Sequence, residues 1–116
     1  NVYTKKGYFT VATGHCEKSL ELDNNNFITM NRLAWLYAKK RIKLEKAFKL
    51  SSQTLEAYPK RDEFIDTLSE ILYVQGKTKK AMAKIQEAIK LVPNDSYYKQ
   101  QLWKFKNVKP EVSPAG

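Results

Sequence analysis

The sequence predicts an all-α protein built from repeated pairs of antiparallel helices. Within residues 62–93, apolar residues recur at helical spacing on both sides of Gly76. Glycine adopts the left-handed conformation that ends many helices, and Pro93 cannot continue a helix. The same unit recurs upstream at a constant offset, because Leu33 and Leu68 lie 35 positions apart. A period of about 34 residues with two helices per period is typical of a helical-repeat array.

The apolar positions and the turn residues predict where each helix begins and ends. Asn26 is a good N-cap, and Asn94 and Asp95 cap the last helix. Three basic residues at positions 39–41 suit the negative C-terminal end of the helix that they close. The predicted helices span residues 8–22, 27–40, 44–58, 62–75, 77–91 and 96–106.

Small residues at fixed positions predict where the helices cross closely. Alanine recurs as Ala12, Ala47 and Ala81, with spacings of 35 and 34 residues. Alanine adds little side-chain bulk, so Ala81 and Ala88 allow two helix backbones to approach each other. The larger apolar residues expected to pack are Phe27, Met30, Leu33, Leu36, Tyr37, Phe64, Ile65, Leu68, Ile71, Leu72, Ile85 and Ile89. Trp35 falls outside this main apolar stripe.

These features make the chain resemble a tetratricopeptide repeat protein. The family motif places Leu-(Gly/Ala)-x2-Tyr in a first helix, then a glycine, then Ala-x3-aromatic-x2-Ala-x4-Pro. Residues 62–93 match through Ile65, Leu68, Gly76, Ala81, Ala88 and Pro93; residues 27–59 through Leu33, Ala34, Tyr37, Ala47 and Pro59; residues 1–26 through Tyr3, Gly7, Ala12 and the run LELDNN. The middle copy departs from the motif with one extra residue in its turn and with Thr54 where a second alanine is usual.

The resemblance implies a right-handed α-solenoid of antiparallel helix pairs with a C-terminal capping helix. We expect a repeat domain over 1–106, divided into a truncated repeat (1–26), two repeats (27–61 and 62–95) and the capping helix (96–106), followed by a flexible tail over 107–116. Residues 1–6 fall where a first helix should be ending, so we expect a C-terminal piece of a longer array. The incomplete repeat leaves apolar surface near Val11 and Leu20 uncovered, which favours a homodimer through that end.

The residues that carry most enzyme chemistry are scarce in this chain. Its 116 residues include one histidine and one cysteine, His15 and Cys16, and its four glycines are dispersed. The sequence therefore contains no Cys/His metal motif, no Gly-rich phosphate loop and no nucleophile with a recognisable base. We expect no enzymatic activity, no cofactor, no metal and no small-molecule substrate, and we expect Cys16 to be a packed side chain.

Charge is distributed unevenly along the chain, whose net charge is +9. Residues 62–75 carry four acidic and no basic residues, which gives −4. Residues 77–91 carry five lysines and one glutamate, which gives +4, and residues 39–49 carry six basic residues and one glutamate, which gives +5. A basic balance of this kind fits a nucleic acid or an anionic surface as partner, or a solvated lysine-rich face.

The resemblance also implies that first helices line a concave surface and that second helices form the convex one. Glu63, Asp66 and Glu70 are spaced three and four residues apart, so they share one helical face. Asn31 and Trp35 hold the equivalent face of the preceding first helix. We expect these five side chains to face solvent in a groove that binds a ligand segment with positive charge and an apolar anchor. The alternative is an ordinary solvated face.

We therefore expect a protein–protein interaction module or scaffold that captures a peptide or helix of another protein on its concave face. Two alternatives stay open: a structural spacer or self-association segment of a longer array, and a nucleic-acid-binding surface made by the lysines of the convex helices. In the second case Tyr97, Tyr98 and Trp103 are available for stacking on bases. No run of about 18 apolar residues is present, so we expect a soluble protein, cytoplasmic or periplasmic, without membrane insertion.

Overall fold

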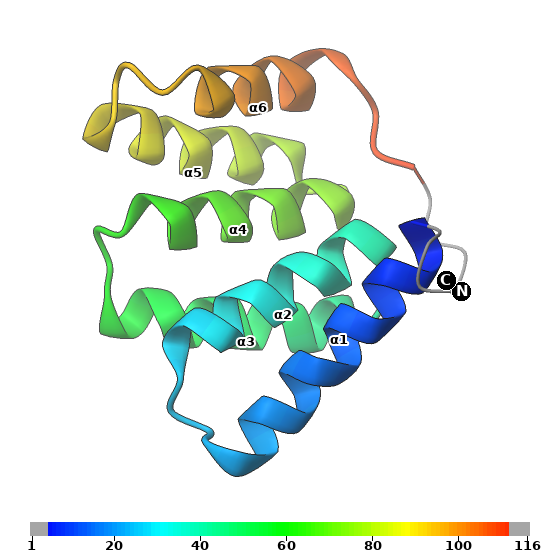
Figure 1. Ribbon diagram of the computed structural model, residues 1–116. Helices are drawn as coiled ribbons and strands as arrows, with labels where there is room; N and C mark the ends of the chain where they lie inside the picture. Colours follow the sequence, from blue (N-terminus) through cyan, green and yellow to red (C-terminus); the bar gives the residue numbers. More distant parts are fainter. Residues whose placement is uncertain (1–4, 112–116) are drawn as a thin grey trace.

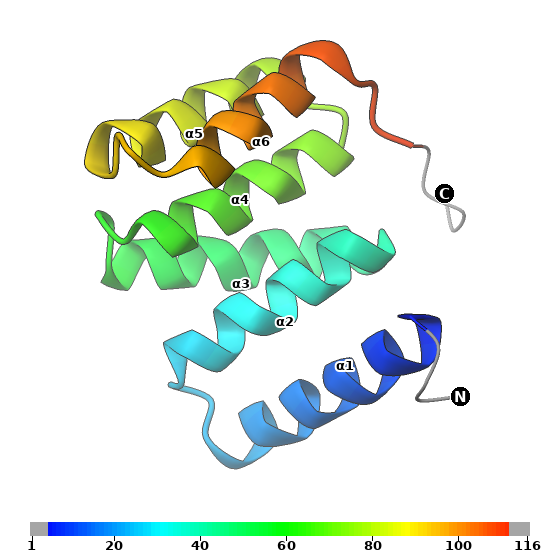
Figure 2. The ribbon, with the colours of Figure 1, turned by 45° about the horizontal axis from the view of Figure 1, so that its top comes forward.

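The computed structural model describes residues 5–111, which form helices and turns without any strand. The helices in this range are α1 (Lys5–Leu22), α2 (Phe27–Lys40), α3 (Leu44–Ala57), α4 (Asp62–Val74), α5 (Thr78–Leu91) and α6 (Ser96–Asn107). They are stacked in chain order, with α1 at one end and α6 at the other (Figure 1, Figure 2). The prediction of an all-α fold is confirmed, and each helix agrees with a predicted one to within three residues at either end.

Polar caps and one glycine set several helix ends, as the sequence predicts. The Asn26 side chain accepts a hydrogen bond from the Thr29 backbone N–H at 3.1 Å, which caps α2. The Asp95 carboxylate accepts one from the Tyr97 backbone N–H at 2.9 Å, which caps α6. Gly76 has a φ of +84°, so it supplies the left-handed conformation that follows α4.

The turn between α2 and α3 also uses the left-handed backbone conformation, but without a glycine. Arg41 and Lys43 both take the left-handed conformation, with φ values of +56° and +48°. This conformation costs a residue with a Cβ atom roughly 1–2 kcal/mol. The backbone N–H groups of Arg41 and Ile42 donate to the carbonyl oxygens of Ala38 and Tyr37 at 3.1 and 3.0 Å, which closes α2. Two left-handed residues that carry a Cβ atom therefore form this turn.

Helix α4 lies at the centre of the stack and packs against α2, α3, α5 and α6. Every residue from Phe64 to Val74 is buried. Fully buried alanines, Ala47 on α3 and Ala81 and Ala88 on α5, leave room for the neighbouring helices to approach closely. The ring of Tyr73 stacks on that of Phe105 with centroids 4.8 Å apart, which joins α4 to α6.

Large apolar side chains fill the space between the helices. Burial of each contributes about 1.5–3 kcal/mol relative to full exposure. The largest apolar or aromatic side chains with under 2% exposure are Tyr37, Phe64, Phe105, Leu33, Ile65, Ile71 and Ile85. They come from α2, α4, α5 and α6, so one continuous core joins these four helices.

Helix α1 packs mainly against α2 and keeps part of its surface open. Tyr8 and Val11 are 52% and 41% exposed, whereas Cys16 is buried as predicted. Val11 is therefore exposed as expected, whereas Leu20, the other residue expected at an uncovered surface, is half-buried against the core. Within residues 5–111, no helix combines the length and the apolar character needed to cross a bilayer.

Residues 107–111 differ from the flexible tail that the sequence predicts. Asn107 belongs to α6. The Tyr73 hydroxyl donates to the Val108 carbonyl oxygen at 2.8 Å, and the Arg41 guanidinium lies 3.8 Å from the Glu111 carboxylate. These contacts tie the segment to α4 and to the α2–α3 turn. The remaining residues of the predicted tail, 112–116, and Tyr3 of the predicted truncated repeat lie outside the described residues.

Leu68→Ala should lower the free energy of unfolding by about 2–5 kcal/mol, because it removes a buried side chain from the central helix. Urea unfolding followed by circular dichroism measures this loss. Leu22→Ala is the matched control, since Leu22 is 84% exposed and should change stability by less than about 0.5 kcal/mol. Similar losses for both variants would contradict the burial pattern.

Candidate functional site

A hollow of about 670 Å³ opens between α2, α4 and the start of α6, with α1 at its edge. We call it the α2–α4–α6 groove. Its walls are lined by Tyr8, Phe9, Ile28, Asn31, Arg32, Trp35, Leu36, Glu63, Asp66, Thr67, Asp95, Tyr97 and Tyr98. Four of the five residues predicted to form a binding face, Asn31, Trp35, Glu63 and Asp66, therefore lie around one hollow. Glu70 is not part of its lining.

Helical spacing places the lining residues of α2. Ile28, Asn31 and Trp35 follow one another at intervals of three and four residues, so their side chains leave the helix on one side. On α4, Asp66 and Thr67 lie three and four residues after Glu63, so these three side chains also share one side of their helix. Because α2 and α4 pack side by side, the two rows face a common space. The start of α6 closes this space with two tyrosines.

The apolar part of the groove is partly open to solvent. Ile28 and Tyr97 are 54% and 41% exposed. Trp35 is half-buried, and the Lys39 ammonium lies 4.6 Å from the centroid of its ring. The lysine therefore covers part of the ring and holds it in place by a cation–π contact. Asn31 adds a side-chain oxygen that is buried and has no hydrogen-bond partner among the described residues.

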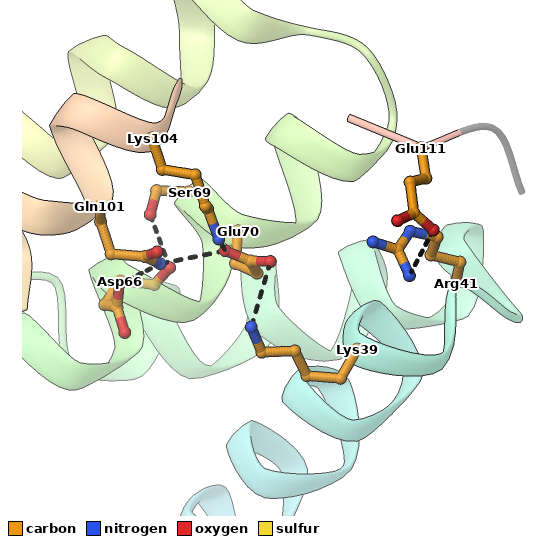
Figure 3. Close-up of polar contacts among 8 residues, drawn as sticks. All are labelled: Lys39, Arg41, Asp66, Ser69, Glu70, Gln101, Lys104 and Glu111. Atoms are coloured by element: carbon orange, nitrogen blue, oxygen red, sulfur yellow. Dashed lines mark hydrogen bonds and ion pairs between the residues drawn. The ribbon is translucent and has the colours of Figure 1, made fainter. Parts of the chain in front are cut away.

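Two of the predicted site residues are not exposed, which corrects the expectation that the whole acidic face meets solvent. Asp66 and Glu70 are only 7% and 3% exposed, whereas Glu63 is exposed as predicted. The physical reason is the packing of α6, which covers this part of α4. Gln101 and Lys104 extend from α6 to meet the two carboxylates (Figure 3).

Glu70 is held by cations from two helices. Its carboxylate accepts a hydrogen bond from the Lys104 ammonium at 2.8 Å and from the Gln101 amide at 3.0 Å, and it lies 3.6 Å from the Lys39 ammonium (Figure 3). Burial by itself raises the pKa of Glu70. The hydrogen bond from Lys104 and the charge of Lys39 outweigh burial, so the pKa lies below its usual value. Glu70 is therefore ionised at neutral pH and joins α2, α4 and α6.

Asp66 has fewer compensating contacts. Its carboxylate accepts one hydrogen bond from the Gln101 amide at 3.1 Å. Burial raises the pKa of Asp66 to about 6, the neighbouring Glu70 charge adds to this effect, and the Gln101 hydrogen bond opposes it. The negative charge that Asp66 presents to the groove consequently depends on pH near neutrality.

A tyrosine at the start of α6 makes another contact with α4. The Tyr98 hydroxyl donates to the Asp62 carboxylate at 2.5 Å. Burial and this hydrogen bond both raise the pKa of Tyr98, so its hydroxyl stays protonated. Together with Tyr73 near the other end of α4, this contact fixes α6 along the length of its neighbour.

Sequence reasoning missed Tyr97, Tyr98 and Ile28 as groove residues. The sequence suggests the two tyrosines only as residues for stacking on nucleic-acid bases. Gln101 and Lys104 lie three residues apart on one helix and Asp66 and Glu70 lie four apart on another, so each pair shares a helical face. That these two faces meet follows only from the docking of α6 on α4.

The groove offers non-covalent contacts to a ligand. Among residues 5–111, no group of three or more His, Cys, Asp or Glu side chains is arranged to hold a metal ion. The Cys16 thiol is buried, and burial raises its pKa, which makes it a poor nucleophile at neutral pH. What the lining supplies is aromatic surface, hydrogen-bonding groups and carboxylates.

Comparison with protein-family models finds no match, and comparison with curated proteins finds no significant similarity. The tetratricopeptide resemblance therefore stays an interpretation of residue spacing. Function is inferred from the residues that line the groove, their exposure and their charge.

Glu70→Gln should lower the free energy of unfolding by roughly 1–3 kcal/mol, because it leaves Lys39 and Lys104 without their buried counter-charge. Amide hydrogen exchange in α6 should accelerate. Glu87→Gln is the matched control, because the Glu87–Lys84 pair lies at the surface and contributes less than about 1 kcal/mol. The role assigned to Glu70 would be contradicted if both variants lost the same free energy of unfolding in urea, or if amide exchange in α6 stayed unchanged in Glu70→Gln.

Asp66→Asn should stabilise the protein at pH 7 by roughly 2 kcal/mol, because the folded pKa of about 6 lies above the ordinary value of 3.8. The folded state binds this proton more tightly, so the wild type loses stability as the pH rises from about 4 to about 6. Asparagine removes the charge and keeps an oxygen that accepts from Gln101.

Melting temperatures of both proteins between pH 4 and pH 8 check this expectation. The advantage of the variant should be largest above pH 6 and should disappear near pH 4. Glu70 acts in the opposite sense, because its lowered pKa stabilises the fold above about pH 4.5 and this gain is lost on acidification. Comparing the two proteins at each pH therefore isolates Asp66. If Asp66→Asn were less stable than the wild type at pH 7, the raised pKa assigned to Asp66 would be contradicted.

Proposed function

We propose that the chain is a tetratricopeptide-like repeat module that binds a segment of another protein in the α2–α4–α6 groove. The repeat interpretation is supported by the phased residue pattern and by the packing of α2 on α3, of α4 on α5 and of α2 beside α4. Repeat arrays of this kind build extended concave surfaces, because each unit contacts only its neighbours.

The observation that carries the proposal is the composition of the groove. Trp35, Tyr97 and Ile28 leave apolar and aromatic surface accessible around one hollow. Tryptophan and tyrosine are enriched among the residues that contribute most to protein–protein binding. A volume of about 670 Å³ holds a few side chains of a bound segment.

The charge of the lining favours a basic ligand. Three carboxylates, those of Glu63, Asp66 and Asp95, line the groove together with one guanidinium, that of Arg32. The lining is therefore net negative in a chain whose overall charge is +9. Such complementarity selects partners and fixes their orientation more than it adds affinity. We infer a ligand with an apolar anchor next to lysine or arginine.

The groove is formed before a ligand arrives. The contacts of Glu70, Tyr98 and Asp62 hold α6 against α4, and the Lys39 ammonium holds the Trp35 ring. Little conformational entropy is then lost on the receptor side, and the ordering cost falls on the bound peptide.

Tyr97→Ala and Trp35→Ala should each weaken binding of a basic peptide with an aromatic anchor by about tenfold or more. The test peptide comes from a library of fluorescent peptides that vary in charge and apolar content. The library is screened by fluorescence anisotropy at physiological salt. Trp103→Ala is the matched control, because Trp103 lies on α6, is 62% exposed and does not line the groove. Melting curves establish that each variant is folded.

Two outcomes would overturn the proposal. One is that no peptide binds with a Kd below about 1 mM. The other is that a bound ligand is indifferent to Trp35 and Tyr97 but is lost when Lys79, Lys80 and Lys84 are neutralised. The second result, with a steep dependence on salt, would instead assign binding to the basic surface of α5.

A further inference from the structure

A second hollow, larger than the first, lies on a different face of α2. Its volume is about 970 Å³, and its walls come from α1, α2, α3 and the α1–α2 turn. We call it the α1–α3 groove. Phe27, Met30 and Leu33 line it from α2, whereas Ile28, Asn31 and Trp35 line the α2–α4–α6 groove. At 3.6 residues per turn these two sets point to different sides of the helix.

The α1–α3 groove has an apolar floor. Leu20 on α1, Phe27 on α2 and Leu50 on α3 are half-buried and line it together with Met30. Helix α1 turns away from α3 along its length (Figure 1), so α2 forms the bottom of the space between them. An accessible apolar patch with a polar rim is a feature of protein–protein interaction sites.

The rim of this groove is acidic. Glu17, Glu21 and Glu56 line it, against the single cation Lys46. Glu17 is already engaged by the Tyr37 hydroxyl at 2.5 Å and by the Lys43 ammonium at 3.3 Å. Glu21 and Glu56 are exposed and form no ion pair with another described residue. They are available to an external cation.

The opposite end of the stack carries a complementary surface. Helix α6 contains no acidic residue, and its outer side presents Trp103, 62% exposed, between the exposed Lys99 and Lys106. Intervals of three and four residues place these three on one face. Tyr97, which lines the α2–α4–α6 groove, leaves α6 in another direction. An apolar ring flanked by cations matches an apolar floor flanked by carboxylates.

We propose that the α1–α3 groove binds the outer face of α6 from a second copy of this chain, with Trp103 against the apolar floor and Lys99 and Lys106 near Glu21 and Glu56. The two surfaces lie at opposite ends of the stack (Figure 1, Figure 2). Each copy then keeps one surface free, so association is head to tail and extends into chains. This contact is independent of the peptide-binding groove.

Sedimentation velocity over increasing concentration, up to about 1 mM, tests the contact. We expect the mean mass to rise beyond that of a dimer at about 50 mM salt and to fall as salt screens the charges. Trp103→Ala should weaken association by about tenfold or more. Tyr97→Ala is the matched control on the same helix and should leave association unchanged.

A charge exchange makes the test specific to these surfaces. In the double variant Glu21→Lys/Glu56→Lys, the rim of the α1–α3 groove becomes basic like the outer face of α6. In the double variant Lys99→Glu/Lys106→Glu, the outer face of α6 becomes acidic like the rim of the groove. Each double variant alone should stay monomeric, and an equimolar mixture should associate again, because opposite charges then meet. Rescue of this kind is not expected from a loss of folding.

Three outcomes would overturn the proposal. The wild type is monomeric throughout the concentration range. The wild type associates but is insensitive to Trp103→Ala and to the charge variants, which would point to the open face of α1 or to another contact. The mixture of double variants stays monomeric while both proteins are folded by circular dichroism.

Discussion

Helix α6 is held in place by the carboxylates that α4 buries. A glutamate that is 3% exposed requires compensation, because an unpaired charge in the interior is costly. Lys104 from α6 and Lys39 from α2 provide it, and Gln101 bridges Glu70 to Asp66. The same few atoms therefore connect three helices that are separated along the chain, and the stacked Tyr73 and Phe105 rings add apolar contact beside them.

This polar cluster also shapes the α2–α4–α6 groove. Lys39 reaches Glu70 on one side and covers the Trp35 ring on the other, so the position of the indole depends on the buried charge. Tyr98, which donates a hydrogen bond to Asp62, brings the adjacent Tyr97 to the groove wall. The acidic residues predicted to contact a ligand thus differ in their structural role: Glu63 remains at the surface, and Glu70 secures the fold.

The two hollows on α2 illustrate how one helix serves two surfaces. The side that carries Trp35 meets α4 and α6, and the side that carries Phe27 and Met30 meets α1 and α3. Acidic residues outnumber basic ones in the lining of both hollows, although the chain as a whole is basic. The two proposals therefore concern separate surfaces of the same helix.

Local sequence determined the helices, because capping by Asn26 and Asp95, the left-handed Gly76 and the apolar spacing act within a few residues of one another. The spacing of Asn31 and Trp35 on α2 also accounts for their position on one side of that helix, beside Glu63 in the lining of the same hollow. Spacing on a single helix cannot tell whether a carboxylate meets water or another helix, so the burial of Asp66 and Glu70 was decided only by the docking of α6. The α1–α3 groove was likewise invisible in the sequence, because it arises from the angle between helices rather than from any one of them.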